Sequence, residues 1–284
     1  MTTTHAPAPA LVEVLVDVSR ALSEDIGSGD VSAALIPAAR QASARIITRE
    51  RCVLAGRDWA ELCFRLLDPA VRVGWHVAEG AEAETGALLC EVEGQARALL
   101  SAERSALNFL QTLSATAGAA RRLVELVAHT GVRLLDTRKT LPGLRSAQKY
   151  AVTVGGAHNH RQGLYDAYLI KENHLAAAGS IAAAVSVARR AHPELLLQVE
   201  VENFEQLQEC LDLSVRRVLL DNFSVEQTRL AVQRVAGRME LESSGGIDDH
   251  TLVAYAETGV DFISIGALTK HIRAIDLSMR VKLQ

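Results

Sequence analysis

The sequence contains few aromatic residues and only four cysteines. The first shortage bears on the core, and the second excludes two kinds of protein. Phe, Trp and Tyr together make up 4% of the 284 residues, so we expect an aliphatic core of Ala, Leu and Val. The cysteines form no C-x-x-C pair, and none has a histidine at the spacing of a zinc site. We therefore interpret them as reduced thiols in a reducing compartment, which excludes a disulfide scaffold and a structural zinc domain. The four are Cys52, Cys63, Cys90 and Cys210.

The sequence also lacks a recognisable signal peptide and an apolar run long enough to cross a membrane. Residues 1–10 carry no basic segment, and Glu13 and Asp17 interrupt the apolar stretch that follows. The formal net charge of −4 argues against a general nucleic-acid or membrane surface. We expect a cytoplasmic protein of one large or two modest domains, with neither nucleic acid nor membrane among its partners.

One segment of this acidic chain is strongly basic. Residues 133–171 contain seven Lys or Arg residues and only two acidic residues, so this segment carries +5 and the remainder −9. A basic island in an acidic protein indicates a binding site for an anionic ligand, and the alternative is a solvated basic face. The basic residues are Arg133, Arg138, Lys139, Arg145, Lys149, Arg161 and Lys171, and the acidic ones are Asp136 and Asp166.

The first part of the chain predicts a small α+β domain with an antiparallel sheet. Residues 6–10 form an expected loose tail, and apolar residues at helical spacing over 11–26 end at Gly27, a suitable helix cap. We place this domain at residues 1–116, with residues 272–284 packing back on it. Its other expected helices are 58–67 and 98–127, the latter as one helix or two, and its expected strands are 44–49, 71–77 and 87–92.

From residue 132 onward, short apolar runs alternate with amphipathic helices, which is typical of parallel βα units. A doubly wound open sheet has this pattern too, but reactive residues at nearly every strand end favour a barrel, where they meet in one pocket. We count six strands rather than eight, and therefore expect an incomplete or atypical α/β barrel over residues 117–271. The expected strands are 132–135, 167–170, 195–201, 218–220, 239–241 and 262–265, and the helices are 180–191, 204–211, 225–235 and 249–258.

The ends of the first two strands supply hydrogen-bond donors and positive charge. Several cations in one pocket repel one another, by up to ~4 kcal/mol per pair at 4 Å and an effective dielectric constant near 20. A polyanionic ligand relieves this repulsion, and the guanidinium fork matches carboxylates and phosphates. We therefore predict a polyanion site rather than a solvated surface. Its donors are Thr137, Arg138, Lys139, His160, Arg161 and Lys171.

Carboxylates end the next two strands. Glu200 and Glu202 share one face of their strand, and Asp221 ends the following one. Carboxylates beside a phosphate site hold Mg²⁺, directly or through water, or accept hydrogen bonds from ribose hydroxyls. Ordinary ion pairing with the neighbouring cations is the alternative, and it is compatible with either role.

Glycines follow the last two strands, where barrels often bind a phosphate. Ser243, Ser244, Gly245 and Gly246 follow the fifth strand, and Ile265, Gly266 and Ala267 follow the sixth. Because glycine lets main-chain N–H groups approach an anion closely, this order of loops predicts a phosphate cradle beside the cationic pocket.

At these positions the sequence resembles the quinolinate phosphoribosyltransferase family. The resemblance extends over essentially the whole chain beyond the tail. It rests on residues 24–32 (EDIGSGDVS), 103–108 (ERSALN), 136–144 (DTRKTLPGL), 158–173 (HNHRQGLYDAYLIKEN), 199–203 (VEVEN), 219–223 (LLDNF) and 242–246 (ESSGG). His158 departs from it, since a small residue is expected there; it is either inert or an added cation beside the carboxylate pocket.

The resemblance implies transfer of phosphoribose from phosphoribosyl pyrophosphate to quinolinate, with Mg²⁺ and loss of CO₂, giving nicotinate mononucleotide for NAD synthesis. Its motifs assign the quinolinate carboxylates to Arg138, His160 and Arg161, and neutralisation of pyrophosphate or carboxylate to Lys139 and Lys171. Glu200 and Asp221 serve the ribose hydroxyls and Mg²⁺. The 5′-phosphate falls to Ser244, Gly245, Gly246 and the loop Ile265, Gly266 and Ala267. The resemblance also implies a homodimer in which Arg104 completes the partner's site.

Three alternatives stay open at this point. A related transferase on the same scaffold, such as the member associated with molybdenum transport, acts on another acceptor. A Schiff-base lyase also places a lysine such as Lys171 at a barrel strand end, but does not need so many arginines. A phosphate-binding regulator binds its ligand without turnover.

Overall fold

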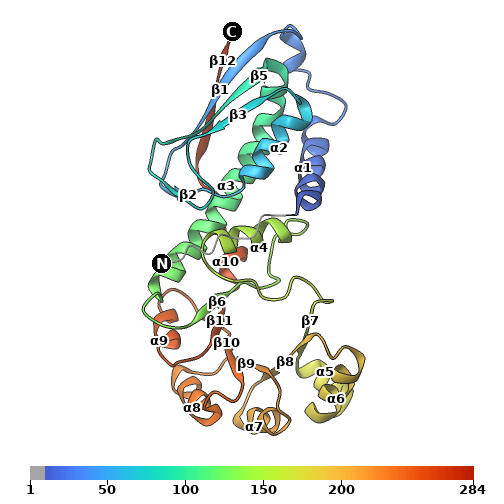
Figure 1. Ribbon diagram of the computed structural model, residues 1–284, viewed down its shortest axis with the longest axis vertical. Helices are drawn as coiled ribbons and strands as arrows, with labels where there is room; N and C mark the ends of the chain where they lie inside the picture. The colour runs from blue at the N-terminus through green and yellow to red at the C-terminus, as the bar shows by residue number, and fades with distance from the viewer. Residues whose placement is uncertain (1–9) are drawn as a thin grey trace. The chain divides into compact units, whose positions relative to one another are not determined.

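The computed structural model describes residues 10–284, which form two compact units (Figure 1). The first unit takes residues up to 121, returns for 140–156 and returns again for 268–284; the second consists of 122–139 and 157–267. Because each unit is made of more than one segment of the chain, the structure has no single boundary to compare with the one expected between residues 116 and 117, which stays a prediction. The expected tail lies outside the described residues except for Ala10. Among residues 10–284, no helix is long and apolar enough to span a bilayer.

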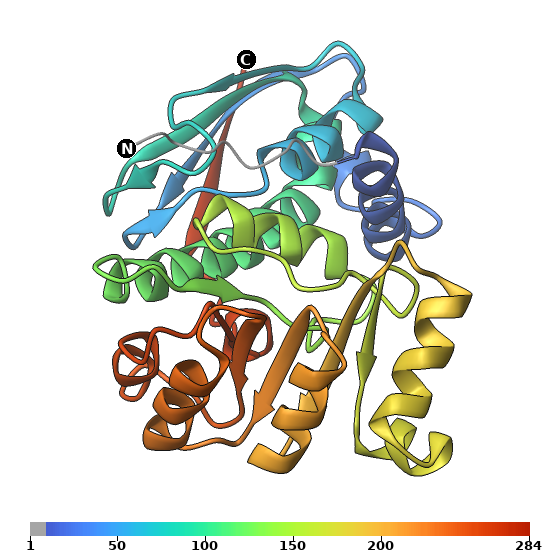
Figure 2. The same cartoon turned by 60° about the horizontal axis from the view of Figure 1, so that its bottom comes forward.

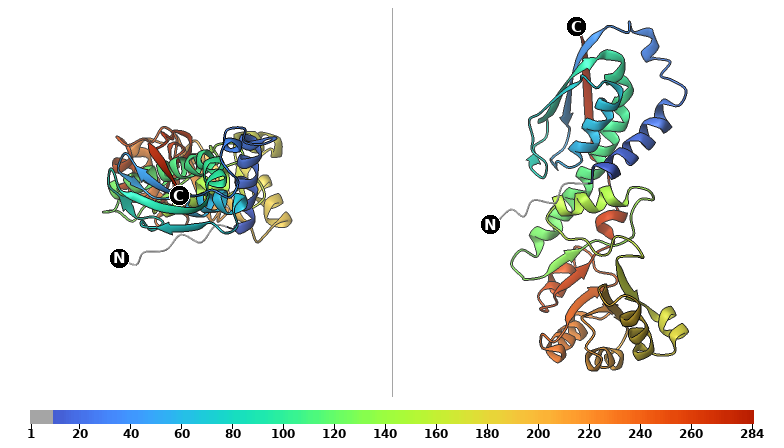
Figure 3. Two further views of the ribbon diagram at one scale, coloured as in Figure 1. Left: turned by 90° about the horizontal axis from the view of Figure 1, so that it is seen from above. Right: turned by 45° about the vertical axis from the view of Figure 1, so that its right-hand side comes forward.

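The first unit is an antiparallel sheet with helices on one face, as Figure 3 shows for α2 (Arg57–Leu67) and α3 (Ala96–Leu126). The four strands run in the order β12-β1-β5-β3, with bounds Leu277–Leu283, Gln41–Thr48, Leu88–Gln95 and Arg72–Trp75. β12 was not expected from the sequence; it pairs antiparallel with β1, with Ala42 opposite Leu283. The unit's other elements are α1 Leu11–Ile26, η1 Ala33–Leu35, β2 Cys52–Val53, α2 Arg57–Leu67, β4 Glu82–Ala83, α4 Arg145–Val154 and α3 Ala96–Leu126 up to Arg121. The last residues of α3, from Arg122 onward, belong to the second unit.

Amphipathic spacing explains how α1 packs. Val14, Val18 and Leu22 are buried at intervals of four residues, and the helix ends at Gly27 with a positive φ of 53°. Residues 98–127, expected as one helix or two, form the single helix α3. All four cysteines are free and buried, as expected of structural thiols, and burial raises the pKa of Cys63, Cys90 and Cys210 to about 12.

The second unit is a curved parallel sheet of six strands with its helices on the outer face (Figure 2). The strand order is β6-β11-β10-β9-β8-β7, so neighbours in sequence are neighbours in space apart from β6. The strands are β6 Arg133–Leu135, β7 Ala167–Ile170, β8 Leu196–Val201, β9 Arg217–Asp221, β10 Glu240–Ser244 and β11 Phe262–Ser264. The helices are α5 Glu172–Ala178, α6 Ile181–Ala191, α7 Phe204–Asp212, α8 Val225–Val235 and α9 Leu252–Ala256. The short α10 Ala267–Lys270 follows β11, and from Leu268 onward it belongs to the first unit.

This sheet is a barrel that does not close. In the described part of the chain β6 and β7 do not pair, and one bridge between Leu135 and His158 stands in the gap. The His158 N–H donates to Leu134 O at 2.8 Å, and its carbonyl accepts from Asp136 N at 3.0 Å. The expected incomplete α/β barrel with a separate α+β part is therefore confirmed.

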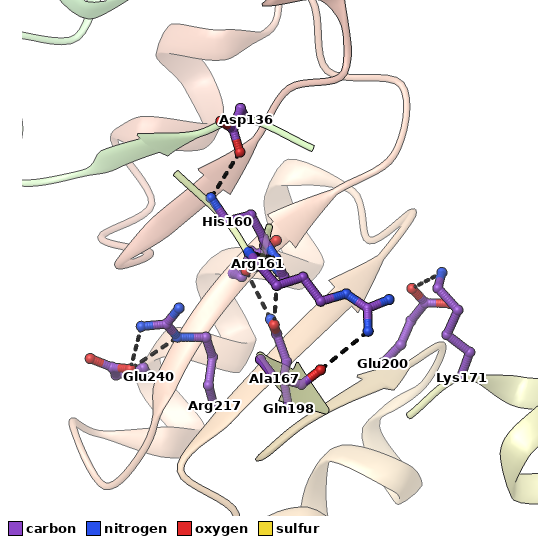
Figure 4. A network of polar contacts seen from close by, with 10 residues as sticks. Asp136, His160, Arg161, Ala167, Lys171, Gln198, Glu200, Arg217 and Glu240 are labelled. Carbon is purple, nitrogen blue, oxygen red and sulfur yellow. Dashed lines mark hydrogen bonds and ion pairs between the residues drawn. The ribbon is translucent and has the colours of Figure 1, made fainter. Parts of the chain in front are cut away.

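Polar caps and a partly buried ion pair stabilise the second unit. Side chains of Ser180, Asn203 and Ser224 cap the first turns of α6, α7 and α8. At the amino ends of the strands, Arg217 donates two hydrogen bonds to Glu240 Oε2 and lies 3.9 Å above the Phe262 ring (Figure 4). These contacts lie at the amino ends of β9, β10 and β11, away from the carboxyl ends of the strands.

Candidate active site

Two adjoining cavities open at the carboxyl ends of the barrel strands. The cationic cavity has a volume of about 320 Å³ and is characterised by Arg138, Lys139, His160, Arg161, Lys171 and Glu242. The glycine cavity has about 330 Å³ and is characterised by Asp221, Asn222, Ser244, Gly245, Gly246 and Gly266. Both include Thr137, Lys139, Lys171, Glu200, Ser244 and Ser264, so a ligand in one cavity lies next to a ligand in the other.

The guanidinium of Arg161 lies in the wall of the cationic cavity. Its Nη1 donates to the Ala167 carbonyl at 3.3 Å (Figure 4), which orients the side chain. Burial and the neighbouring charge of Arg138 both lower the pKa of Arg161. Arginine nevertheless stays protonated in proteins, so two mutually repelling cations line one small space. Such a wall favours an anionic ligand.

A buried polar network lies beneath this wall. The Asp136 carboxylate, with no exposed surface, accepts from His160 N at 2.9 Å. The imidazole Nδ1 accepts from Arg161 N at 2.7 Å, while Nε2 lies 3.0 Å from Gln198 Oε1 and 3.4 Å from Glu242 Oε2. Because Nδ1 faces a donor and Nε2 faces two acceptors, this geometry suits a ring proton on Nε2. Both ring nitrogens of His160 thus have partners within the protein.

Lys171 and Glu200 form an ion pair on the border of the two cavities. Lys171 Nζ lies 2.6 Å from Glu200 Oε2, and the Lys171 N–H donates to His174 Nδ1 at the start of α5 (Figure 4). Burial raises the pKa of Glu200; Lys171 opposes this effect and the nearby Asp221 carboxylate adds to it. The carboxylates at the ends of β8 and β9 are thus close enough to interact electrostatically.

The glycine cavity depends on backbone conformations that favour glycine. Gly245 and Gly246 have φ values of 100° and 62°, and a Cβ on Gly245 would lie 2.2 Å from Asn222 Oδ1. Asn222 itself has φ 55°; its N–H donates to Ser244 O and its Nδ2 to Asp221 Oδ2, both at 2.9 Å. The loop after β10 therefore packs directly on the end of β9.

Most residues predicted from sequence line these cavities. The structure brings together Thr137, Arg138, Lys139, His160, Arg161, Lys171, Glu200, Asp221, Ser244, Gly245, Gly246 and Gly266. Their roles as ligands stay predictions.

Several other expected residues lie elsewhere. Ile265 lies outside both linings: its side chain is 2% exposed and its N–H donates to Leu135 O, so its expected contact with a ligand stays a prediction. Ala267 begins α10 outside both linings, and the exposed Glu202 is also outside them. Arg104 is exposed on α3 in the first unit.

His158 also lies outside both linings. Partial burial and the charge of Arg133 lower its pKa. Its main chain extends the sheet edge, and its imidazole adds no cation to the cavity wall.

Sequence reasoning gave no role to Gln198, Glu242, Asn222 and Ser264, although all four take part in the site. Gln198 could have been found by alternation, because it lies two residues before Glu200 on the same strand. Glu242 stood inside the ESSGG motif, but nothing local distinguishes a buried glutamate from a surface one.

The chain matches two descriptions of one protein family over nearly its whole length. Residues 30–114 match "Quinolinate phosphoribosyl transferase, N-terminal domain", and residues 116–280 match the C-terminal domain of the same family.

Named relatives agree with this match. The chain is 44% identical to the nicotinate-nucleotide pyrophosphorylase [carboxylating] of Mycobacterium leprae, over 92% of this chain and 95% of that protein. It is 39% identical to the probable enzyme of the same name in Bacillus subtilis, over 92% and 90%. The structure of the nicotinate-nucleotide pyrophosphorylase from Francisella tularensis superimposes with a TM-score of 0.94 at 44% identity, covering 99% of this chain and 100% of that one. The chain belongs to the quinolinate phosphoribosyl transferase family.

Proposed function

We propose that this protein transfers phosphoribose from phosphoribosyl pyrophosphate to quinolinate, releasing pyrophosphate and CO₂ and forming nicotinate mononucleotide for de novo NAD biosynthesis. The observation that carries the proposal is the pair of adjoining cavities that share Lys139, Lys171 and Glu200. One cavity suits a small dianion, as quinolinate is. The other suits a phosphate group, such as the 5′-phosphate of phosphoribosyl pyrophosphate.

Quinolinate suits the cationic cavity because its two carboxylates balance charges on the wall. Arg138 and Arg161 present guanidinium groups to a space of about 320 Å³, enough for one small aromatic acid. Both ring nitrogens of His160 bind groups of the protein, so we assign this ring to shaping the cavity and holding Arg161 N. The two arginines supply the positive charge that binds the carboxylates.

The donor suits the glycine cavity. The main chain of Gly245, Gly246 and Gly266 leaves room for a 5′-phosphate, and Asp221 and Glu200 at its border suit the ribose hydroxyls. Lys139 and Lys171 line both cavities, where they balance the charge of the departing pyrophosphate. Holding both substrates side by side supplies proximity, and no covalent protein intermediate is required.

Mg²⁺ fits this site as a partner of the substrate rather than of the protein alone. Among residues 10–284, no group of three or more His, Cys, Asp or Glu side chains can hold a metal by itself. Two interacting carboxylates, Glu200 and Asp221, are what Mg²⁺ requires when phosphate oxygens supply its other ligands. The bound ion would neutralise charge on pyrophosphate as it leaves.

We also infer a cytoplasmic homodimer with shared sites. Leu11, Val12 and Val16, close together on α1, are 74%, 66% and 56% exposed, which supports contact of this helix with another chain. Arg104 is exposed and available to a neighbouring protomer.

The test of the function is turnover. Protein mixed with quinolinate, phosphoribosyl pyrophosphate and Mg²⁺ should produce nicotinate mononucleotide and CO₂. Nicotinate should react poorly, because its single carboxylate leaves part of the cationic wall unbalanced. Comparable rates with both acceptors would disprove the substrate assignment.

Each alternative function has its own expected result. A lyase would form a borohydride-trappable adduct on Lys171, an amine that here lies 2.6 Å from a carboxylate oxygen of Glu200. A regulator would bind phosphoribosyl pyrophosphate without turnover, and a related transferase would be active only with another acceptor.

A further inference from the structure

A buried carboxylate lines the cationic cavity. Glu242 on β10 has no exposed surface, yet it forms part of the wall. Its Oε2 accepts from Gln198 Nε2 at 2.8 Å and lies 3.4 Å from His160 Nε2. Its Oε1 has no hydrogen-bond partner in the described part of the chain. An unpartnered oxygen in the wall of a binding cavity points to a role toward the ligand.

The neighbours of Glu242 favour its ionised form. Burial by itself raises the pKa of Glu242, but His160, Gln198 and the nearby Ser264 hydroxyl lower it, and their combined effect prevails. A negative charge therefore faces the same space as Arg138, Arg161 and Lys171. It opposes the binding of a dianionic acceptor, so attraction for the substrate in its ground state cannot explain it.

The transfer reaction changes the charge of the acceptor ring. The lone pair of the pyridine nitrogen forms the bond to the anomeric carbon while the carbon–oxygen bond breaks and its electron pair leaves with pyrophosphate. The neutral ring thereby becomes a pyridinium cation. In the next step the bond to the adjacent carboxylate breaks, its electron pair stays on the ring carbon beside the cationic nitrogen, and a proton from water completes the product.

We propose that Glu242 stabilises the positive charge that develops on the acceptor ring during transfer. The inference rests on the proposed function. The positively charged side chains that bind the two carboxylates repel the pyridinium ring as its charge develops. A buried anion in the same wall offsets this repulsion, because no water screens it there. Glu242 thus favours the transition state and not the bound substrate, so it should act on kcat rather than on quinolinate affinity.

The principal test is Glu242→Gln, which keeps the shape and an acceptor for Gln198 while removing the charge. We expect kcat to fall by roughly 100-fold, in the range found when one electrostatic group of a transition state is removed. The quinolinate Kd, measured by calorimetry, should stay the same or decrease, because repulsion is removed. The matched control is Glu240→Gln on the same strand, whose carboxylate binds Arg217 away from the cavities; it should keep its kcat.

A second measurement uses the unmodified protein and does not depend on how the variant folds. Phthalate has a neutral ring, whereas N-methylquinolinate carries two carboxylates on a cationic ring. The wild-type protein should bind the cationic ring more tightly than phthalate, by about 10-fold, and Glu242→Gln should lose this preference. Equal binding of the two ligands by the wild-type protein would overturn the proposal, as would an unchanged kcat in a folded Glu242→Gln. Lack of wild-type turnover with quinolinate would instead contradict the proposed function.

Discussion

At the residue scale, hydrogen bonds within the protein position the Arg161 guanidinium in the wall of the cationic cavity. The Arg161 main chain is held through His160 Nδ1, and its guanidinium through the Ala167 carbonyl. His160 is in turn fixed by Asp136 on one side and Gln198 on the other. The arginine is thereby preorganised, so little side-chain entropy is lost when an anion binds.

Arg161→Ala should weaken quinolinate binding with the fold intact. Loss of a charge-assisted contact costs about 1.5–3 kcal/mol, which corresponds to a roughly 10- to 150-fold higher quinolinate Kd or KM. The KM for phosphoribosyl pyrophosphate should change little, because Arg161 does not line the glycine cavity. Arg190→Ala on the exposed face of α6 is the matched control. An unchanged quinolinate KM in Arg161→Ala would exclude Arg161 from the acceptor site.

At the element scale, the ends of β9 and β10 act as one unit. Asn222 after β9 donates its N–H to the carbonyl of Ser244, and its side chain orients Asp221. Gly245 passes so close to Asn222 that a side chain cannot fit between them. The loop proposed to bind phosphate, which contains Gly245, and the Asp221 carboxylate proposed to bind ribose are therefore coupled through Asn222.

Gly245→Ala should impair binding of phosphoribosyl pyrophosphate more than it impairs the fold. The added Cβ would lie 2.2 Å from Asn222 Oδ1, so the loop or Asn222 must move, and Asp221 moves with it. We expect the donor KM to rise at least about 10-fold, a ~1.4 kcal/mol effect. Gly237→Ala is the control, because it has a φ of 75° but open space, and should cost only backbone strain of about 1 kcal/mol in unfolding free energy. Similar donor KM values for the two variants would argue against this coupling.

At the scale of the whole molecule, the chain returns to its first unit twice after starting its second. Residues 140–156 rejoin the first unit between the loop that carries Lys139 and the one that carries His160, and residues 268–284 rejoin it after the last barrel strand. Lys139 and His160 thus belong to the second unit, although the segment between them belongs to the first. The exposed apolar surface of α1 and the exposed Arg104 belong to the first unit.

Mixing two inactive variants tests the shared site. If Arg104 completes the neighbouring protomer's cavity, an Arg104→Ala chain and a Lys139→Ala chain form a heterodimer with one intact site and one site with both lesions. Random subunit exchange at equal amounts makes half of the dimers mixed, so about a quarter of all sites should recover activity. Demonstrated exchange without recovery would place the action of Arg104 within its own chain or outside the reaction.

The sequence by itself determined which residues end the barrel strands and what charge they carry. Short apolar runs followed by Lys171, Glu200 and Asp221 are local patterns, and in a parallel sheet the carboxyl ends of all strands lie on one edge. Helix α1 was predicted at its observed bounds, because its spacing and its glycine cap are also local signals.

Only the tertiary structure decided which of these side chains face a cavity and which are buried beneath one. Ile265 and Gly266 are adjacent in sequence, yet one lies in the core and the other in the glycine cavity. Gln198 and Glu242 come from strands 44 residues apart, and their hydrogen bond depends on the order of strands in the sheet. Long-range pairing leaves no local periodicity to detect, which is why the network under the cationic cavity and the pairing of β12 with β1 appear only in the folded chain.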